Sequence, residues 1–197
     1  MKYIEVSASK GGVGTSTISA CLAIGLAQTG KKVLLVDMSK RGDCFALTGV
    51  SLTSGIVESF VDGMSMTHIA TSPLASGVDK SYDHVIYDAG TNGLQDYAVS
   101  GNVYRLAIAP NAYTALRNMT TIVRGYDAMV SVITEGNALN AKDVEQVMGL
   151  TALAQMPIKP EISRAIDAGM LFTRYEALIE PWIAPLVKAM HKTTISA

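Results

Sequence analysis

A glycine-rich run near the start of the chain contains the residues best suited to chemistry. It reads Ser-Lys-Gly-Gly-Val-Gly-Thr-Ser-Thr over residues 9–17. It follows a strand-like run at 2–7 and opens a helical pattern that begins near Thr15. Glycines let a backbone wrap tightly with its N–H groups turned inward, and a helix N-terminus adds free N–H groups and a positive dipole. The run therefore predicts a loop that binds a polyphosphate.

Two aspartates stand where later β-rich runs end. Asp37 follows the apolar run 33–36, and Asp88 follows the run 84–87. Ligands of open α/β sheets bind at the carboxyl ends of the strands, so we expect both carboxylates to face the crevice of the phosphate loop. The alternatives are that Asp37 only caps a loop and that Asp88 is structural.

The elements that must position these residues alternate along the chain. We expect strands at 2–7, 33–36, 84–87, 105–109, 128–133 and 152–156, with a short additional strand near 66–70. Helical patterns cover 15–29, 54–60, 114–126, 141–148, 161–168 and 175–190. Pro110 and Pro157 are expected to end two of the strands. Continuous apolar strands between helices predict an α/β fold, a three-layer sandwich with a mostly parallel twisted sheet, in a single domain over 1–197.

Composition excludes several classes of protein. The 197 residues carry a formal net charge of −1, and 49% are hydrophobic. This balance argues against a disordered chain and against DNA binding through net positive charge alone. Cys21 and Cys44 do not make a disulfide framework, and His68, His84 and His191 stand apart from any zinc-ligand spacing. With a strand-like start and no apolar run of about 20 residues, we expect a cytoplasmic protein without a membrane span.

The glycine-rich run resembles the deviant Walker A motif of the ParA/MinD family of P-loop ATPases, Lys-Gly-Gly-x-Gly-Lys-(Ser/Thr)-Thr. The resemblance extends over nearly the whole chain and implies a P-loop NTPase fold that binds ATP and Mg²⁺. It implies that Lys10 reaches across a homodimer to the partner's phosphates, and that Ser16 and Asp88 hold the metal. The catalytic residues it suggests are Lys10 and Asp37. The nucleotide-binding set comprises Lys10, Gly11, Gly12, Val13, Gly14, Thr15, Ser16, Thr17 and, as a base contact, Pro157.

Two positions depart from the family pattern. Thr15 stands where the family has the lysine that contacts the β- and γ-phosphates of its own nucleotide. Ser39 stands where the family has the second aspartate of Asp-x-Asp, which positions the attacking water. Threonine supplies no charge, and serine cannot polarise water as a carboxylate does. A hydrogen bond to a charged group is worth roughly 1.5–3 kcal/mol, so we expect weaker nucleotide binding and slow or absent hydrolysis.

Further segments indicate which branch of the family the chain resembles. The degenerate loop, together with 42–50 and 138–145, resembles the TadZ/CpaE-type proteins that localise pilus and secretion machinery. Residues 90–93 resemble the switch-like loop that senses the γ-phosphate. The family's Asn-Arg pair is not evident, and Ser131-Val132 stand at its place. Recognition of adenine over guanine is therefore left open.

The resemblance implies a nucleotide-dependent dimeric positioning factor, for plasmid or chromosome partition or for polar localisation of a pilus or secretion complex. Its partner would be a ParB-like protein or a pilus or secretion component, and nonspecific DNA binding is a weaker expectation. The apolar stripe at 182–190 favours packing on the core over membrane binding. The alternative function is a catalytically inactive pseudo-ATPase scaffold whose assembly does not depend on nucleotide.

Overall fold

The computed structural model describes residues 2–39, 41–50, 58–59, 67–74, 77–91, 102–121, 125–170 and 172–192. Its strands are β1 (Lys2–Ser7), β2 (Val33–Asp37), β3 (Glu58–Ser59), β4 (Thr67–Thr71), β5 (His84–Gly90), β6 (Val103–Pro110), β7 (Ala128–Thr134) and β8 (Ala152–Ile158). Its α-helices are α1 (Thr15–Gln28), α2 (Asp43–Thr48), α3 (Tyr113–Thr121), α4 (Ala141–Met148), α5 (Pro160–Asp167) and α6 (Glu180–Lys192). No helix within these ranges is long and apolar enough to cross a membrane.

The strands form one sheet in the order β3-β4-β2-β5-β1-β6-β7-β8. Every neighbouring pair is parallel except β3 with β4, which is antiparallel. From β1 the chain moves outward past β5 to β2, whereas from β6 it moves the other way to β7 and β8. The direction of winding therefore reverses beside β1, and in open α/β sheets such a reversal opens a crevice at the carboxyl ends of the strands.

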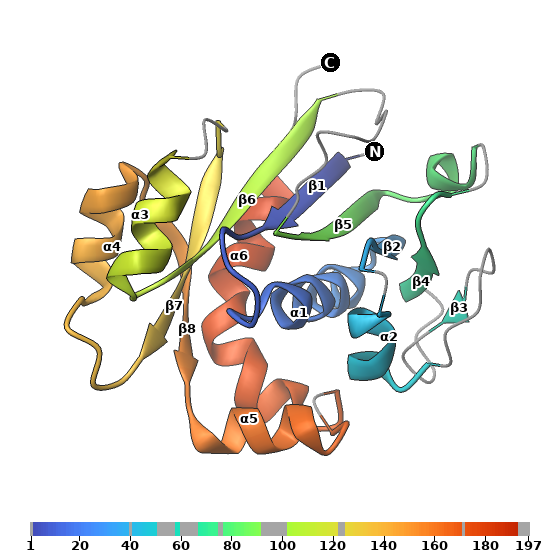
Figure 1. Cartoon of the computed structure of the whole chain (residues 1–197). Helices are drawn as coiled ribbons and strands as arrows, with labels where there is room; N and C mark the ends of the chain where they lie inside the picture. Colours follow the sequence, from blue (N-terminus) through green and yellow to red (C-terminus); the bar gives the residue numbers. More distant parts are fainter. Residues whose placement is uncertain are drawn as a thin grey trace.

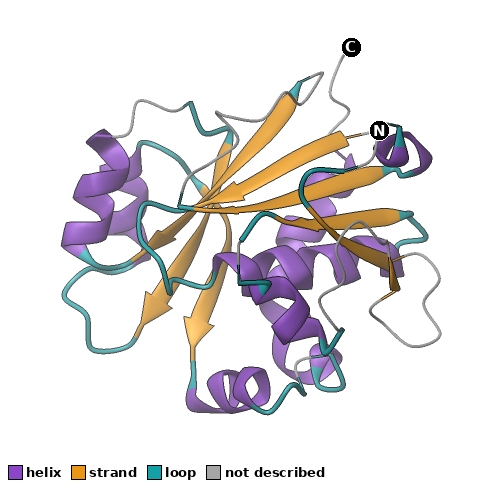
Figure 2. Cartoon of the chain, turned by 45° about the vertical axis from the view of Figure 1, so that its right-hand side comes forward, coloured by secondary structure: helices purple, strands orange, loops and turns teal. Residues whose placement is uncertain are grey.

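Helices cover both faces of the sheet (Figures 1 and 2). On β6, Leu106 and Ile108 belong to the core that includes residues of α1 and α6. The alternate residues Ala107 and Ala109 face the other way, into a core with residues of α3 and α4. Successive strand residues point to opposite faces, so β6 is buried from both sides. The expected three-layer α/β sandwich with a mostly parallel sheet is confirmed.

The helix that follows the phosphate loop is fixed firmly against the C-terminal helix. A Cβ added to Gly25 of α1 would lie 2.5 Å from Val187 Cγ2 and 2.6 Å from the hydroxyl of Tyr175. Tyr175 donates a hydrogen bond of 3.1 Å to the carbonyl oxygen of Cys21. This close approach depends on the missing side chain of Gly25, and it gives the loop at the start of α1 a rigid support.

Some expected boundaries are wrong. Glu58 and Ser59, predicted as helical, form β3, and the remainder of 54–60 lies outside the described residues. Of the helix expected at 114–126, the described part is Tyr113–Thr121, residues 122–124 lie outside the described residues, and 125–126 are not helical. Pro157 does not end its strand, because β8 is an edge strand where a residue without an N–H costs no ladder bond. The sequence reading missed α2, whose six residues are too few to show helical periodicity.

Candidate functional site

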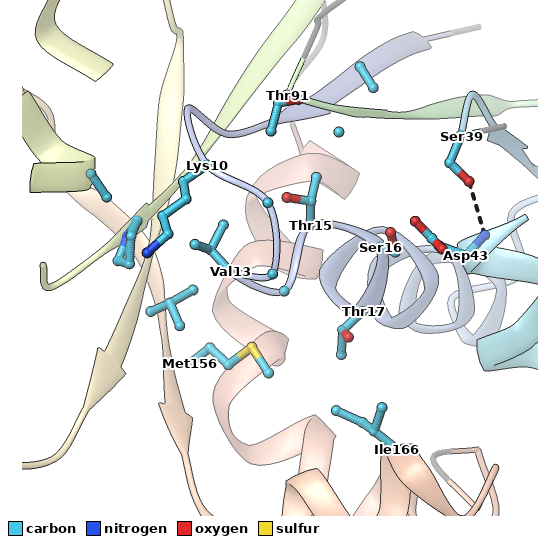
Figure 3. A pocket seen from close by; sticks show the side chains of 18 of the residues that line it. Lys10, Val13, Thr15, Ser16, Thr17, Ser39, Asp43, Thr91, Met156 and Ile166 are labelled. Atoms are coloured by element: carbon cyan, nitrogen blue, oxygen red, sulfur yellow. Dashed lines mark hydrogen bonds between the residues drawn. The ribbon is translucent and has the colours of Figure 1, made fainter. Parts of the chain in front are cut away.

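A cavity of about 1250 Å³ opens at the carboxyl ends of the parallel strands (Figure 3). Its walls come from the ends of β2, β4, β5, β6, β7 and β8 and the loops that follow them, with the glycine-rich loop after β1 in the middle. All eight residues from Lys10 to Thr17 line it. The position is the one expected for a ligand site in a sheet of this winding.

The glycine-rich loop adopts a conformation that requires glycine at two positions. Gly12 and Gly14 have φ angles of +76° and +94°, a region that residues with a Cβ rarely enter. The Ala8 amide donates to the carbonyl oxygen of Gly90 at 2.8 Å, and the Ser9 hydroxyl donates to the carbonyl oxygen of Ala115 at the same distance. Because these bonds tie the loop to β5 and α3, the loop is preorganised around the N-terminus of α1.

The positive charge in this loop lies on one side only. The Lys10 side chain is exposed and extends to the opposite side of the loop from Ser16 (Figure 3). Thr15 is nearly buried in the wall and brings no charge to the other side. Of the described residues that line the cavity, Lys10 and Arg41 are the basic ones. Sequence reasoning missed Arg41, because a single arginine after a strand carries no distinguishing signal.

Ser16 and Asp88, the predicted metal ligands, are in contact. The Ser16 hydroxyl donates a hydrogen bond of 2.6 Å to Asp88 Oδ2, while Asp88 Oδ1 is buried with no hydrogen-bond partner. Burial raises the pKa of Asp88, and the nearby Asp37 carboxylate raises it further. The hydrogen bonds that Asp88 accepts from Ser16 and Cys44 lower this pKa but do not cancel the increase. A buried carboxylate oxygen without a partner beside a hydroxyl fits a divalent cation that takes hard oxygen ligands, so Mg²⁺ suits these residues.

Asp37 lies directly beside Asp88, because the two are register partners on the neighbouring strands β2 and β5. Asp37 Oδ1 accepts the amide of Ser39 at 2.8 Å, and its Oδ2 accepts the amide of Cys44 at 2.7 Å. Both oxygens therefore anchor the β2–α2 loop, which is the loop-capping role that the sequence left open. A catalytic role for Asp37 remains a prediction.

Ser39 has a local structural role. Its hydroxyl accepts the amide of Asp43, the first residue of α2, at 3.0 Å (Figure 3). An oxygen placed at a helix N-terminus satisfies one of the amides that have no partner within the helix. The residue that replaces the expected carboxylate thus helps to hold α2 against the site.

Cys44 is the functional candidate that sequence reasoning missed. Its Sγ donates to Asp88 Oδ2 at 3.2 Å and lies 3.9 Å from the carbonyl oxygen of Ser16. One ligand atom each from Asp37, Cys44 and Asp88 lie within 4.8 Å of one another, and all three residues are buried. Burial and the two carboxylates raise the pKa of the Cys44 thiol. The sequence carries no signal for this contact, because a lone cysteine in this segment matches no ligand motif.

The far end of the cavity is apolar. Val132, Met156, Ile158 and Ile166 line it, and Figure 3 shows Met156 and Ile166 below the loop, with Ser39 at the upper right. Pro157, the expected base contact, alternates with Met156 and Ile158 along β8 and is not among the residues that line the cavity, so its contact with a base stays a prediction.

A buried asparagine shapes the loop beside this apolar end. Asn111 Nδ2 donates to the carbonyl oxygens of Thr134 and Leu139 at 3.0 and 2.8 Å, and its Oδ1 accepts the Thr134 amide at 2.9 Å. Asn137 donates to both the backbone oxygen and Oδ1 of Asn111. Thr134 and Asn137 line the cavity, so Asn111 fixes the polar groups there. Of the expected switch-like loop, Gly90 and Thr91 also line the cavity, whereas residues 92 and 93 lie outside the described part.

Comparisons with known proteins agree with this geometry. An AAA-domain family model matches residues 1–72. A segment of 34 residues, 17% of the chain, is 59% identical to the septum site-determining protein MinD of Helicobacter pylori and spans 13% of that protein's length.

Solved structures with low sequence identity share the fold over almost the entire chain. The MinD cell division protein of Aquifex aeolicus has a TM-score of 0.77 at 16% identity, with 100% of this chain and 99% of that chain covered. A ParA family ATPase of Chlorobium tepidum has a TM-score of 0.71 at 16% identity, covering 95% and 98%. MinD of Pyrococcus horikoshii, solved with Mg-ADP, has a TM-score of 0.69 at 17% identity, covering 97% and 96%.

The N-terminal sequence matches, the loop geometry and the shared fold point in the same direction. The chain has the fold of the MinD and ParA family ATPases, and its first 72 residues match the AAA-domain family model.

Proposed function

We propose that this chain binds ATP together with Mg²⁺ in the cavity, forms a homodimer around the nucleotide and acts as a positioning factor. One observation supports the proposal above others. The glycine-rich loop wraps at the N-terminus of α1 beside Ser16, whose hydroxyl contacts a buried carboxylate with a free oxygen. A loop of amides binds phosphates, and the adjacent oxygens suit the cation that accompanies them.

The residues of the chain have separate tasks in this proposal. The loop amides and the N-terminus of α1 hold the phosphates, and Ser16 with Asp88 holds the cation. A bound Mg²⁺ would neutralise phosphate charge and help to orient the γ-phosphate. Lys10 is exposed and turned away from Ser16, so it is free to reach the phosphates held by a second copy. The apolar far end, between Met156 and Ile166, accepts the base.

Hydrolysis is expected to be slow or absent. Thr15 brings no charge to the phosphates, and the hydroxyl of Ser39 is engaged with α2. Asp37, the candidate catalytic carboxylate, has both oxygens bound to backbone amides. A general base needs a free oxygen for the water that it activates, and these two bonds leave Asp37 poorly placed for that role. Turnover would then depend on electrostatic stabilisation by Lys10 and the cation.

The positioning role comes from the relatives. Structures with the same fold include a MinC:MinD cell division complex and a plasmid partition protein. By analogy the partner of this chain is a ParB-like protein or a component of a pilus or secretion complex, with nonspecific DNA as a weaker candidate.

Binding of labelled ATP with and without Mg²⁺ tests the proposal. We expect saturable binding that strengthens when Mg²⁺ is added, and size-exclusion chromatography should show a dimer with ATP and a monomer without it. Absence of binding at millimolar ATP would refute the nucleotide-binding role. A dimer of equal size in both states would support the alternative, a pseudo-ATPase scaffold, which the structural engagement of Asp37 and Ser39 favours.

A further inference from the structure

The cation end of the cavity contains a thiol that a magnesium site does not need. Cys44 is the second residue of α2, and its Sγ points at Asp88 Oδ2 from 3.2 Å. Asp37 holds Cys44 there, because Asp37 Oδ2 accepts the Cys44 amide at 2.7 Å. The thiol therefore has a fixed place between two carboxylates that come from adjacent strands.

These three side chains lack a cationic partner. In the described part of the chain, no basic side chain forms an ion pair with Asp37 or Asp88. Asp88 is 2% exposed, and its Oδ1 is buried without a hydrogen-bond partner. Burying two neighbouring carboxylates is unfavourable unless a cation or further hydrogen bonds compensate. The unpartnered oxygen thus points to an ion as the group that these carboxylates bind.

The spacing of the ligand atoms suits a small thiophilic ion. Tetrahedral zinc with metal–sulfur and metal–oxygen distances of about 2.3 and 2.0 Å holds the two ligands about 3.5 Å apart. Cys44 Sγ and Asp88 Oδ2 are 3.2 Å apart, and the Asp37, Cys44 and Asp88 ligand atoms all lie within 4.8 Å. Small side-chain shifts would close this set around one ion. Ser16 and Asp37 line the cavity, which gives the ion a route from solvent.

We propose that Asp37, Cys44 and Asp88 form a binding site for a thiophilic divalent cation of the zinc class, which the chain binds without nucleotide. The cation displaces the thiol proton to solvent and takes the thiolate and a carboxylate oxygen from each aspartate as ligands. Because Asp88 and the neighbouring Ser16 are also the proposed magnesium ligands, the two kinds of ion exclude each other. A thiophilic ion thereby blocks the magnesium-dependent step in nucleotide binding.

Cobalt(II) is a suitable probe, because a cobalt–thiolate bond absorbs in the near ultraviolet and oxygen-only ligation does not. Chelator-treated full-length protein is titrated with Co²⁺ in the absence of nucleotide. We expect a thiolate charge-transfer band that saturates at one ion per chain and disappears when Zn²⁺ is added. A wild-type protein with no such band would overturn the proposal, whether or not it binds ATP.

The two cysteines provide a matched pair of variants. Cys21 is buried in α1 and is not one of the three grouped ligand residues, so Cys21→Ala should keep the band, whereas Cys44→Ala should lose it. A band that survives in Cys44→Ala would also refute the assignment. If Cys44→Ala does not fold, Asp37→Asn serves in its place, with at least a tenfold loss of Co²⁺ affinity expected and an unchanged affinity counting against the site.

A competition experiment separates this inference from the proposed function. Zn²⁺ added to wild-type protein should abolish the Mg²⁺-dependent gain in ATP affinity, and the same addition to Cys44→Ala should have at least tenfold less effect. Failure of ATP binding in every condition would refute the proposed function alone, because the cobalt band is measured without nucleotide. Equal inhibition of both proteins by Zn²⁺ would refute the thiolate site alone.

Discussion

At the cation end of the cavity, four polar side chains from four elements meet in one hydrogen-bonded cluster, formed by Ser16, Asp37, Cys44 and Asp88. At the far end, the wall consists mainly of aliphatic and thioether groups on β7, β8 and α5. Polar clusters in a low-dielectric interior depend on each partner, whereas apolar contact scales with area. Substitutions at the cation end should therefore cause large, ion-dependent losses of ATP affinity, and substitutions at the apolar end should cause small, graded losses.

The largest effect should come from Asp88→Asn. The amide still accepts a hydrogen bond from Ser16 but carries no charge for a cation, so we expect at least a tenfold loss of ATP affinity in Mg²⁺. Calorimetric titration should give the same affinity with Mg²⁺ and with chelator. Asp43→Asn, an exposed residue lining the same cavity, is the control and should retain the difference. An Asp88→Asn protein that keeps the Mg²⁺ dependence would place the cation elsewhere.

A positive charge added to the glycine-rich loop should increase ATP affinity rather than reduce it. Thr15→Lys adds an ammonium group beside the phosphates, and a hydrogen bond to a charged group is worth roughly 1.5–3 kcal/mol. We expect ATP to bind about tenfold more tightly or better in an equilibrium titration. Thr15→Ser keeps the hydroxyl and should leave the affinity within about twofold. An unchanged affinity in Thr15→Lys would show that the charge missing at this position does not limit binding.

In the absence of divalent ions, the buried Asp88 carboxylate should also reduce stability in a pH-dependent manner. Because the folded-state pKa of Asp88 is raised, the folded chain binds a proton more tightly than the unfolded chain, and stability falls as pH rises through that range. Without divalent ions, Asp88→Asn should therefore melt at a higher temperature than wild type at pH 7. A difference of 1 kcal/mol corresponds to about 2–4 °C for a chain of this size.

Acidification supplies the control for this stability prediction. The difference between wild type and Asp88→Asn should shrink as pH falls below the folded-state pKa of Asp88, because the wild type then takes up the compensating proton. Mg²⁺ at pH 7 should raise the melting temperature of the wild type alone. A variant that is less stable than wild type at pH 7 would show that the carboxylate is already compensated.

The smallest effect belongs to the apolar end. Ile158 is 38% exposed at the end of β8, so Ile158→Ser removes only part of the surface that a base could contact. We expect about a fivefold loss of ATP affinity from about 1 kcal/mol of apolar contact. Tripolyphosphate, which has no base, should bind both proteins equally. Val147→Ser alters a comparably exposed residue on α4 outside the cavity and should change neither ligand.

These contrasts also separate what could be read along the chain from what could not. The sequence alone indicated the glycine-rich loop, Thr15 and Ser39, because their residues are contiguous or stand at a fixed offset from a strand. The buried strands were visible because a strand covered on both faces is apolar throughout. Helix ends and the two-residue β3 were misjudged, since packing sets them rather than local pattern.

The sequence by itself determined a phosphate loop on an α/β sheet and the absence of a lysine and a carboxylate from their family positions. Only the tertiary structure decided that Cys44 lies against Asp88, that Asp37 binds two amides of the next loop, and that Met156 and Ile158 rather than Pro157 face the cavity. The physical reason is how far apart in the sequence the contacting residues lie. A motif of adjacent residues carries its geometry with it, but contacts across 44 residues depend on strand register, and which side chain of a strand faces a ligand depends on how the sheet packs.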